Sequence, residues 1–186
     1  MITTPRLRVE GFGFLAAYIA CIPIANWLIL HVGTVCPPNG PCLIPVAPGG
    51  VMAPSGVLMA GLALVLRDLV QRRLGVTYGL AAIGAGTVLS AALAPASLVM
   101  ASTIAFLVSE LADFAVYTPL QRRGLVLAVA ASSFVGLVAD SLLFLWLAFG
   151  ALEFLTGQII GKAIMVVLTL PAIRWLRERD KRLGAV

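Results

Sequence analysis

Long apolar stretches alternate with short polar connections along the 186 residues of the chain. Each stretch has the length of about 20 residues that an α-helix needs to cross the hydrocarbon core of a bilayer. The pattern predicts six membrane-spanning helices, at about residues 11–32, 55–72, 76–93, 96–117, 124–149 and 152–176. We therefore expect an all-α integral membrane protein, a six-transmembrane-helix bundle that forms one transmembrane domain over residues 1–186.

The basic residues predict the orientation of these helices. Twelve of the thirteen lie at the ends of apolar stretches, and only at every second end. Short loops rich in Lys and Arg stay in the cytoplasm, so the alternation predicts that both termini are cytoplasmic. Their partner is then the anionic inner leaflet of the lipid bilayer and not a nucleic acid. The twelve residues are Arg6, Arg8, Arg67, Arg72, Arg73, Arg122, Arg123, Arg174, Arg177, Arg179, Lys181 and Arg182.

The longest connection, about residues 31–54, is predicted to lie outside the cell. It contains six prolines and the pair Gly49-Gly50, which indicates an extended segment placed to cover a cavity mouth. Cys36 and Cys42 lie in it, and the outer compartment permits a disulfide. Because the five residues between them include three prolines, the geometry of a bridge is not assured. A disulfide and two free thiols both remain open.

Composition excludes several classes of function. The chain is 61% hydrophobic and only 11% charged, which is too apolar for an ordinary soluble domain. Six spans leave no room for a nucleotide-binding domain, and no GxxxxGK[ST] loop is present. The sequence has one histidine, His31, and neither an HExxH nor a GxSxG motif. We therefore predict that the protein is not an enzyme and uses no metal or cofactor.

Polar side chains inside the predicted spans are the candidates for function. A charged residue at the centre of a membrane helix costs about 2.5–3.5 kcal/mol on insertion scales, so it needs a partner or a cavity. Spacing along the helices places four polar residues in one middle slab, namely Glu110, Asp140, Gln158 and Lys162. It also puts Glu110 and Asp113 on one stripe with the aromatic residues Phe106 and Tyr117. Asp68, beside Arg67, is expected near the inner interface in a local pair. The polar residues are Asn26, Asp68, Glu110, Asp113, Asp140, Gln158 and Lys162.

Two interpretations of these residues remain open. Lys162 with Asp140 or Glu110 would make an ion pair that only locks the bundle. With Asp113 included, however, three carboxylates face one lysine, and at least two of them lack a basic partner at that depth. Such acids must be neutral, hydrated or bound to a ligand. Together with nearby aromatic rings they favour a binding cavity for a flat ligand, and Asp113 and Asp68 are the candidates for proton coupling.

One segment resembles a known family. Residues 101–113, ASTIAFLVSELAD, continuing to Val116-Tyr117, resemble the central motif of the vitamin uptake transporter (VUT) family of bacterial queuosine-precursor transporters. Further similar positions follow in the same order along most of the chain. They are Ala25-Asn26, Arg67-Asp68-Leu69, Arg72, Gly75, Ser132-Ser133, Gly136, Asp140-Ser141, Phe144, Lys162 and Leu170-Pro171.

The resemblance implies uptake of a small heterocyclic substrate, a 7-deazaguanine compound, by a multi-pass protein of the bacterial cytoplasmic (inner) membrane. A carboxylate can accept the guanidine-like N–H edge of such a ring at two points. Glu110 is the first candidate for this contact and Asp140 the second. The ring carbonyl would be met by a donor, and the ring face by an aromatic side chain. The candidate donors are Lys162, Asn26 and Gln158, and the candidate aromatic residues are Phe106 and Tyr117.

Two other functions fit the same pattern. A chain of this size suits the substrate-capture subunit of an energy-coupling-factor-type vitamin importer, docked on an energy-coupling module through the small residues Ala16 and Ala20. A non-transport membrane scaffold, in which the charges only hold helices together, also fits. A homo-oligomer is compatible with each of these functions.

Overall fold

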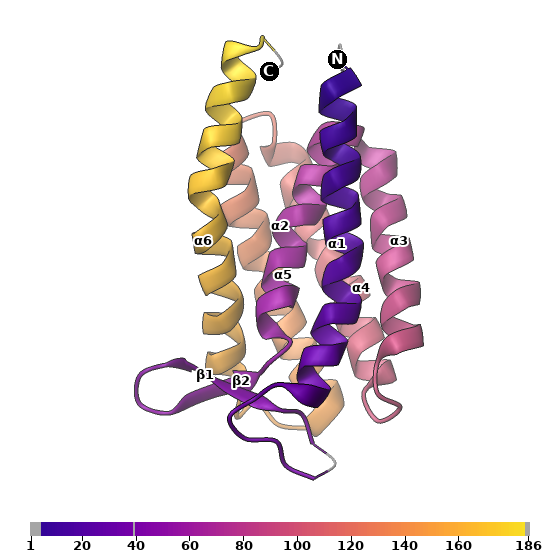
Figure 1. The fold of residues 1–186 in the computed structure, drawn as a ribbon, viewed down its shortest axis with the longest axis vertical. Coiled ribbons are helices and arrows are strands. Elements are labelled where there is room, and N and C mark those ends of the chain that lie inside the picture. Colours follow the sequence, from indigo (N-terminus) through magenta and orange to yellow (C-terminus); the bar gives the residue numbers. More distant parts are fainter. Residues whose placement is uncertain (1–4, 39, 185–186) are drawn as a thin grey trace.

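The computed structural model describes residues 5–38 and 40–184. In this part of the chain six α-helices run along one long axis, and consecutive helices point in opposite directions (Figure 1). Both described ends of the chain lie at one end of the bundle, here called the terminal end. The connection from the first helix to the second lies at the other, here called the hairpin end. The helices are α1 Pro5–His31, α2 Val57–Leu74, α3 Val76–Leu93, α4 Val99–Leu120, α5 Leu125–Phe149 and α6 Leu155–Arg182.

Helix α2 is the centre of the bundle. Among the described residues, five helices are long and apolar enough to cross a membrane, and α2 is the one that falls short because of its four charged residues. It contacts every other helix, and twelve of its 18 residues are buried. Protein therefore surrounds α2 where the other helices present apolar side chains outwards. A central helix can carry charges that a lipid-facing helix cannot.

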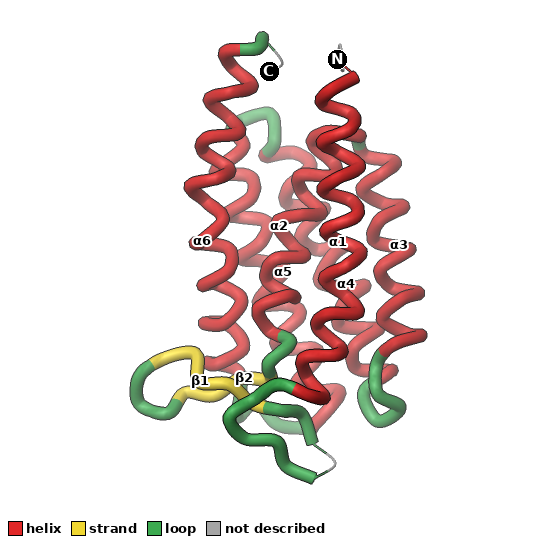
Figure 2. The backbone as a smooth tube through the Cα atoms, viewed as in Figure 1, coloured by secondary structure: helices red, strands yellow, loops and turns green. Residues whose placement is uncertain are grey.

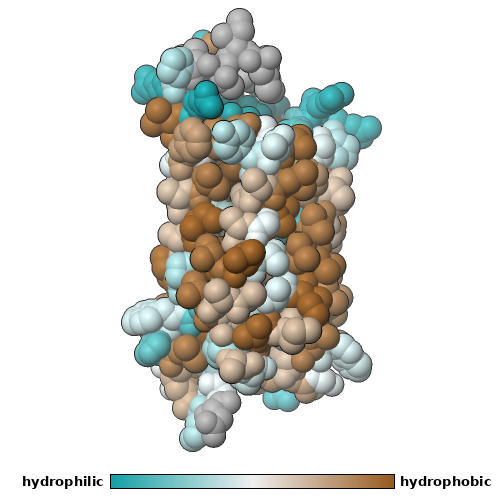
Figure 3. Space-filling model, turned by 90° about the vertical axis from the view of Figure 1, so that its right-hand side faces the viewer, coloured by the Kyte–Doolittle hydropathy of each residue, from teal (hydrophilic) through white to brown (hydrophobic). Residues whose placement is uncertain are grey.

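The outer surface fits a membrane protein. On the face shown in Figure 3, apolar residues cover the middle of the molecule and polar residues gather at its two ends. Large apolar side chains that are more than half exposed come from each of the five outer helices. Examples are Trp27, Val88, Met100, Phe134, Trp146 and Leu168. The chain is thus a multi-pass membrane protein by length, composition and surface.

The predicted helix boundaries agree with the structure to different degrees. The span 76–93 matches α3 at both ends, whereas α6 continues to Arg182 and α1 begins at Pro5. The added residues at these helix ends include charged ones. They lie outside the apolar stretch, so hydropathy alone does not show that the helix continues through them. Helix α4 ends at Leu120, three residues after the end of the predicted span 96–117 and one residue after Pro119.

The connection at the hairpin end contains two strands that the sequence did not indicate. Strand β1, Leu43–Ala47, pairs with the antiparallel strand β2, Val51–Pro54 (Figure 2). The turn between them uses Gly49 and Gly50, both with positive φ, a conformation that glycine adopts without strain. Cys36 and Cys42 form a disulfide, which resolves the open question about these thiols. The hairpin contacts α6 and so packs against the bundle.

Candidate substrate-binding site

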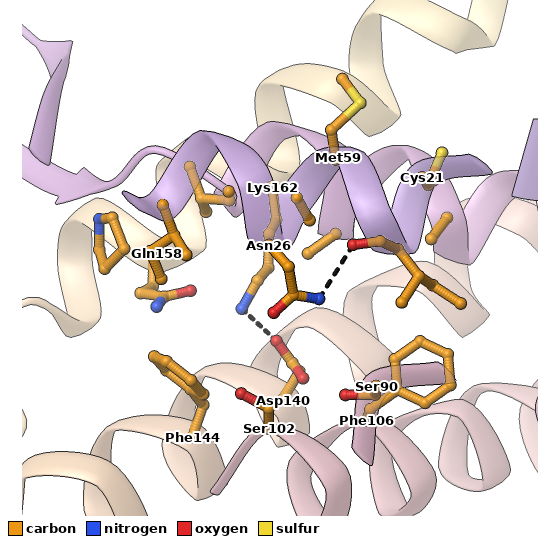
Figure 4. Close-up of a pocket in the computed structure, with 18 residues that line it drawn as sticks. Cys21, Asn26, Met59, Ser90, Ser102, Phe106, Asp140, Phe144, Gln158 and Lys162 are labelled. Atoms are coloured by element: carbon orange, nitrogen blue, oxygen red, sulfur yellow. Dashed lines mark hydrogen bonds and ion pairs between the residues drawn. The ribbon is translucent and has the colours of Figure 1, made fainter. Parts of the chain in front are cut away.

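A cavity of about 110 Å³ lies in the half of the bundle nearer the hairpin end (Figure 4). A buried water needs about 10–15 Å³ on the same scale, so the space suits a compact molecule of roughly a dozen non-hydrogen atoms. All six helices contribute to its wall. The polar and aromatic residues that line it are Asn26, Ser90, Ser102, Phe106, Asp140, Phe144, Gln158 and Lys162.

An ion pair between α5 and α6 forms the middle of the cavity wall. The Lys162 Nζ lies 2.6 Å from Asp140 Oδ2 and donates a hydrogen bond of 2.8 Å to Ser141 Oγ. Only 1% of the Lys162 side chain is exposed, against 20% of the Asp140 side chain. An ammonium group has three donors, and these contacts use two of them. The pair is therefore held in place by protein and still has capacity to bind a ligand.

Two amides flank this ion pair. Asn26 Nδ2 donates a hydrogen bond of 3.0 Å to the backbone oxygen of Ile22, which turns the side-chain oxygen of Asn26 towards the cavity. Gln158 lies one helical turn before Lys162 on α6 and is buried. Together with the ion pair, the amides offer both donors and acceptors within one small space.

Two phenyl rings stand at opposite ends of the row of polar groups (Figure 4). Phe106 packs against Tyr18, with ring centroids 6.4 Å apart, and Phe144 packs against Phe149 at 6.0 Å. These neighbours hold the rings in position. The cavity thus combines apolar faces at its ends with polar groups between them, the arrangement that small-molecule sites commonly have.

A second group of charged residues lies outside this cavity, around Arg67 of α2. Its Nε is 3.2 Å from Glu110 Oε2, its Nη2 is 2.9 Å from Asp68 Oδ1, and it also pairs with Asp113. The Arg67 guanidinium carbon lies 5.7 Å from the centroid of the Tyr117 ring. We call Arg67, Asp68, Glu110 and Asp113 the Arg67 cluster. Each of its members is at most 1% exposed.

The structure therefore divides the predicted site. Asn26, Phe106, Asp140, Gln158 and Lys162 line the cavity. The other predicted residues, Glu110, Asp113 and Tyr117, surround Arg67 instead and are absent from the cavity lining.

Two expectations about charge are corrected by this arrangement. Arg67 and Asp68 form the expected local pair, at 2.9 Å, but both are fully buried inside the bundle and are not exposed at its end. The inference that acids at membrane depth lack a basic partner is also wrong, since Arg67 reaches Glu110 and Asp113. The reason is that Arg67 lies on a face of α2 that is covered by the other helices, and the extent of an apolar stretch does not show which face of a helix is covered. The polar residues Arg67, Asp68 and Gln71 within one turn of α2 were the available signal.

Comparison with known protein families agrees with the membrane architecture. A family model described as "Putative vitamin uptake transporter" matches residues 57–176, from the start of α2 to near the end of α6. The chain belongs to the vitamin uptake transporter family. It is therefore a membrane transporter for a small molecule. No curated protein and no solved structure matches the chain.

The terminal end of this transporter holds a third group of charges, which the sequence did not single out. Asp180 of α6 is fully buried and accepts hydrogen bonds of 2.8 Å from both Arg72 and Arg73 of α2. Glu10 of α1 pairs with Arg179 at 2.6 Å and with Arg73 at 3.3 Å. These contacts join α1, α2 and α6 at the end of the bundle opposite the cavity. Acidic residues among the arginines of the helix ends were the available signal.

A glycine of α2 sets the position of Lys162 in this transporter. A Cβ atom on Gly61 would lie 2.6 Å from the backbone oxygen of Lys162 and 2.8 Å from its Cα. We expect Gly61→Ala to lower the free energy of unfolding by about 1–3 kcal/mol, because α6 would have to move away from α2. Thermal unfolding in detergent measures this loss. Gly84→Ala is the matched control, since its Cβ would meet nothing within 4 Å, and an equal loss there would contradict the steric explanation.

Proposed function

We propose that this protein takes up a 7-deazaguanine queuosine precursor, or a related flat heterocycle, across the bacterial cytoplasmic membrane. The observation that carries the proposal is the cavity, in which an ion pair and two amides lie between two phenyl rings. Its volume and its mixture of donors and acceptors suit a bicyclic base. The membership in the vitamin uptake transporter family supports transport of a small molecule.

Asp140 is the group proposed to bind the guanidine-like edge of the heterocycle. Glu110 was the first candidate from sequence, but its carboxylate contacts Arg67 and is absent from the cavity lining. Asp140 lines the cavity and is partly exposed to it. Lys162 and the two amides are then in position to meet the ring carbonyl and remaining ring atoms. Phe106 and Phe144 supply apolar contact for the ring.

The proposed orientation has six spans, with both termini in the cytoplasm. Arginines concentrate at the terminal end, as the rule for cytoplasmic loops requires. The cavity then lies in the outer half of the membrane, while the Glu10 and Asp180 ion pairs lie at the inner end. This arrangement suits a state that accepts substrate from outside.

Ligand binding tests the proposal on purified protein. We expect 7-cyano-7-deazaguanine or its aminomethyl analogue to raise the unfolding temperature in detergent, because a ligand that binds only the folded state stabilises it. Asp140→Ala should abolish the shift. Phe134→Ala is the control, since Phe134 is 62% exposed on the outside of α5. A shift with vitamins or purines but with no deazapurine would overturn the substrate assignment.

Uptake into cells that lack their own carrier tests transport itself. Wild type and Phe134→Ala are expected to accumulate labelled precursor, whereas Asp140→Ala is not. Uptake by Asp140→Ala at the wild-type rate would contradict the assigned site.

A substrate-capture subunit of an energy-coupling module is the alternative. Ala16 and Ala20 of α1 are exposed and form a small-residue face on which a partner helix could pack. Transport by the purified chain alone in liposomes would exclude dependence on such a module.

A further inference from the structure

The Arg67 cluster has more acid than base. One guanidinium is in ion-pair contact with the three carboxylates of Asp68, Glu110 and Asp113. With every group ionised, the cluster would carry a formal charge of −2, that is +1 from Arg67 and −3 from the acids. Uncompensated charge in a buried site is costly, so a cationic species must balance part of it.

Four buried polar atoms at the cluster have no hydrogen-bond partner among the described residues. They are the carboxylate oxygens Asp68 Oδ1 and Asp113 Oδ2 and the hydroxyls of Tyr18 and Tyr117, and the Tyr117 ring lies beside the Arg67 guanidinium. All four residues are fully buried. A buried polar atom without a partner usually indicates a missing proton, water or ion. The second carboxylate oxygen of Asp68, Oδ2, accepts a hydrogen bond of 2.8 Å from Ser132 of α5, and Asp68 Oδ1 lies 2.9 Å from Arg67 Nη2.

The chemistry of the cluster favours a proton over a metal ion. The guanidinium already lies against all three carboxylates and would repel a second fixed cation. No group of three or more His, Cys, Asp or Glu suited to a metal occurs in the part of the chain that the structure describes. A proton needs only one carboxylate oxygen. The groups that face the site are Arg67, Asp68 and Gln71 of α2, Glu110, Asp113 and Tyr117 of α4, Ser132 of α5 and Tyr18 of α1.

The cluster adjoins the cavity along two helices. On α4, Phe106 lines the cavity and Glu110 follows four residues later. On α2, Ala63 lines the cavity and Arg67 follows four residues later. Four residues make about one helical turn, a rise of roughly 5–6 Å. The charged groups of the cluster are therefore about one helical turn from residues that line the cavity.

We propose that the Arg67 cluster, with Asp113 as its central acid, is the proton-binding site that couples substrate uptake to the proton gradient. This inference rests on the proposed transport function. A proton from the outer side binds the cluster with substrate in the cavity, and both leave towards the cytoplasm. Acidity outside then drives accumulation.

Proteoliposomes separate coupling from transport. The probe is labelled 7-cyano-7-deazaguanine, and two activities are measured: exchange at equal pH and accumulation under an imposed inward proton gradient. Wild type is expected to show both. Asp113→Asn is expected to keep exchange and lose gradient-driven accumulation by roughly tenfold or more, the size of a typical coupling between two sites. Glu178→Gln, at an exposed acid of α6, is the matched control and should behave as wild type.

Each result decides the proposal. Two results would overturn the coupling site alone. One is wild-type protein that exchanges substrate but accumulates it to the same level with and without the proton gradient. The other is an Asp113→Asn variant that accumulates substrate like wild type. Accumulation driven by a sodium gradient would overturn the proton assignment. Absence of exchange in wild type would contradict the proposed function, and the coupling with it. If Asp113→Asn does not fold, Glu110→Gln is measured in the same way, with Asp113→Glu expected to retain accumulation.

Discussion

Replacing Arg67 with methionine is expected to prevent the protein from accumulating in a folded form. The change removes the guanidinium but leaves three carboxylates buried in the centre of the bundle. Removing one partner of a buried ion pair typically costs about 3–5 kcal/mol, and here a single residue serves three acids. Methionine is similar in length and apolar, so the loss reflects charge and not a cavity. The yield of monodisperse protein after detergent extraction measures it.

Two further variants make this result specific. Arg174→Met removes an exposed arginine of α6 and should give the wild-type yield. Combining Arg67→Met with Asp68→Asn and Asp113→Asn should recover part of the yield, because most of the stranded negative charge is removed. A normal yield for Arg67→Met alone would show that the buried acids do not need this guanidinium.

Replacing Lys162 with methionine is expected to lower stability and to abolish substrate binding. Lys162 is 1% exposed, and its loss strands Asp140 without its cation. A cost of about 3–5 kcal/mol is typical for one partner of a fully buried pair, and the 20% exposure of the Asp140 side chain should place this cost at the lower end. Thermal unfolding in detergent, with and without 7-cyano-7-deazaguanine, reports both effects.

A double variant separates the structural role of this pair from its role in binding. Lys162→Met with Asp140→Asn removes both charges and should restore most of the stability, since a buried ion pair can often be replaced without loss. Under the proposed function it should still give no thermal shift with the ligand. A double variant that unfolds like wild type and still binds would show that the charges serve only to hold α5 and α6 together.

Much of the fold could be predicted from the sequence because hydropathy is a local property. A stretch long and apolar enough to cross a bilayer forms a helix whatever its neighbours are. On this basis the sequence predicts both the first and the last residue of α3. The strands β1 and β2 were not predicted. Their pairing depends on a turn at Gly49-Gly50 and on contacts with α6, and neither is visible as an apolar repeat.

The candidate site was predicted in part for a related reason. Placing a polar side chain inside the membrane costs free energy, so such residues can be recognised in the sequence as candidates for function. Five of the eight predicted substrate-binding residues line one cavity. Depth alone cannot say which helix faces which. Glu110 and Asp140 were expected to share one middle slab, yet Glu110 turns to Arg67 and Asp140 to Lys162.

The sequence by itself determined that this protein is a membrane helix bundle, which end of each helix carries the arginines, and which buried polar residues need an explanation. Only the tertiary structure decided that α2 lies at the centre, that Arg67 pairs with acids more than forty residues away, and that Cys36 and Cys42 are bridged. The physical reason is that hydropathy and spacing fix the depth of a side chain along its helix. Its direction around the helix axis, and so its partner, depends on how all six helices pack.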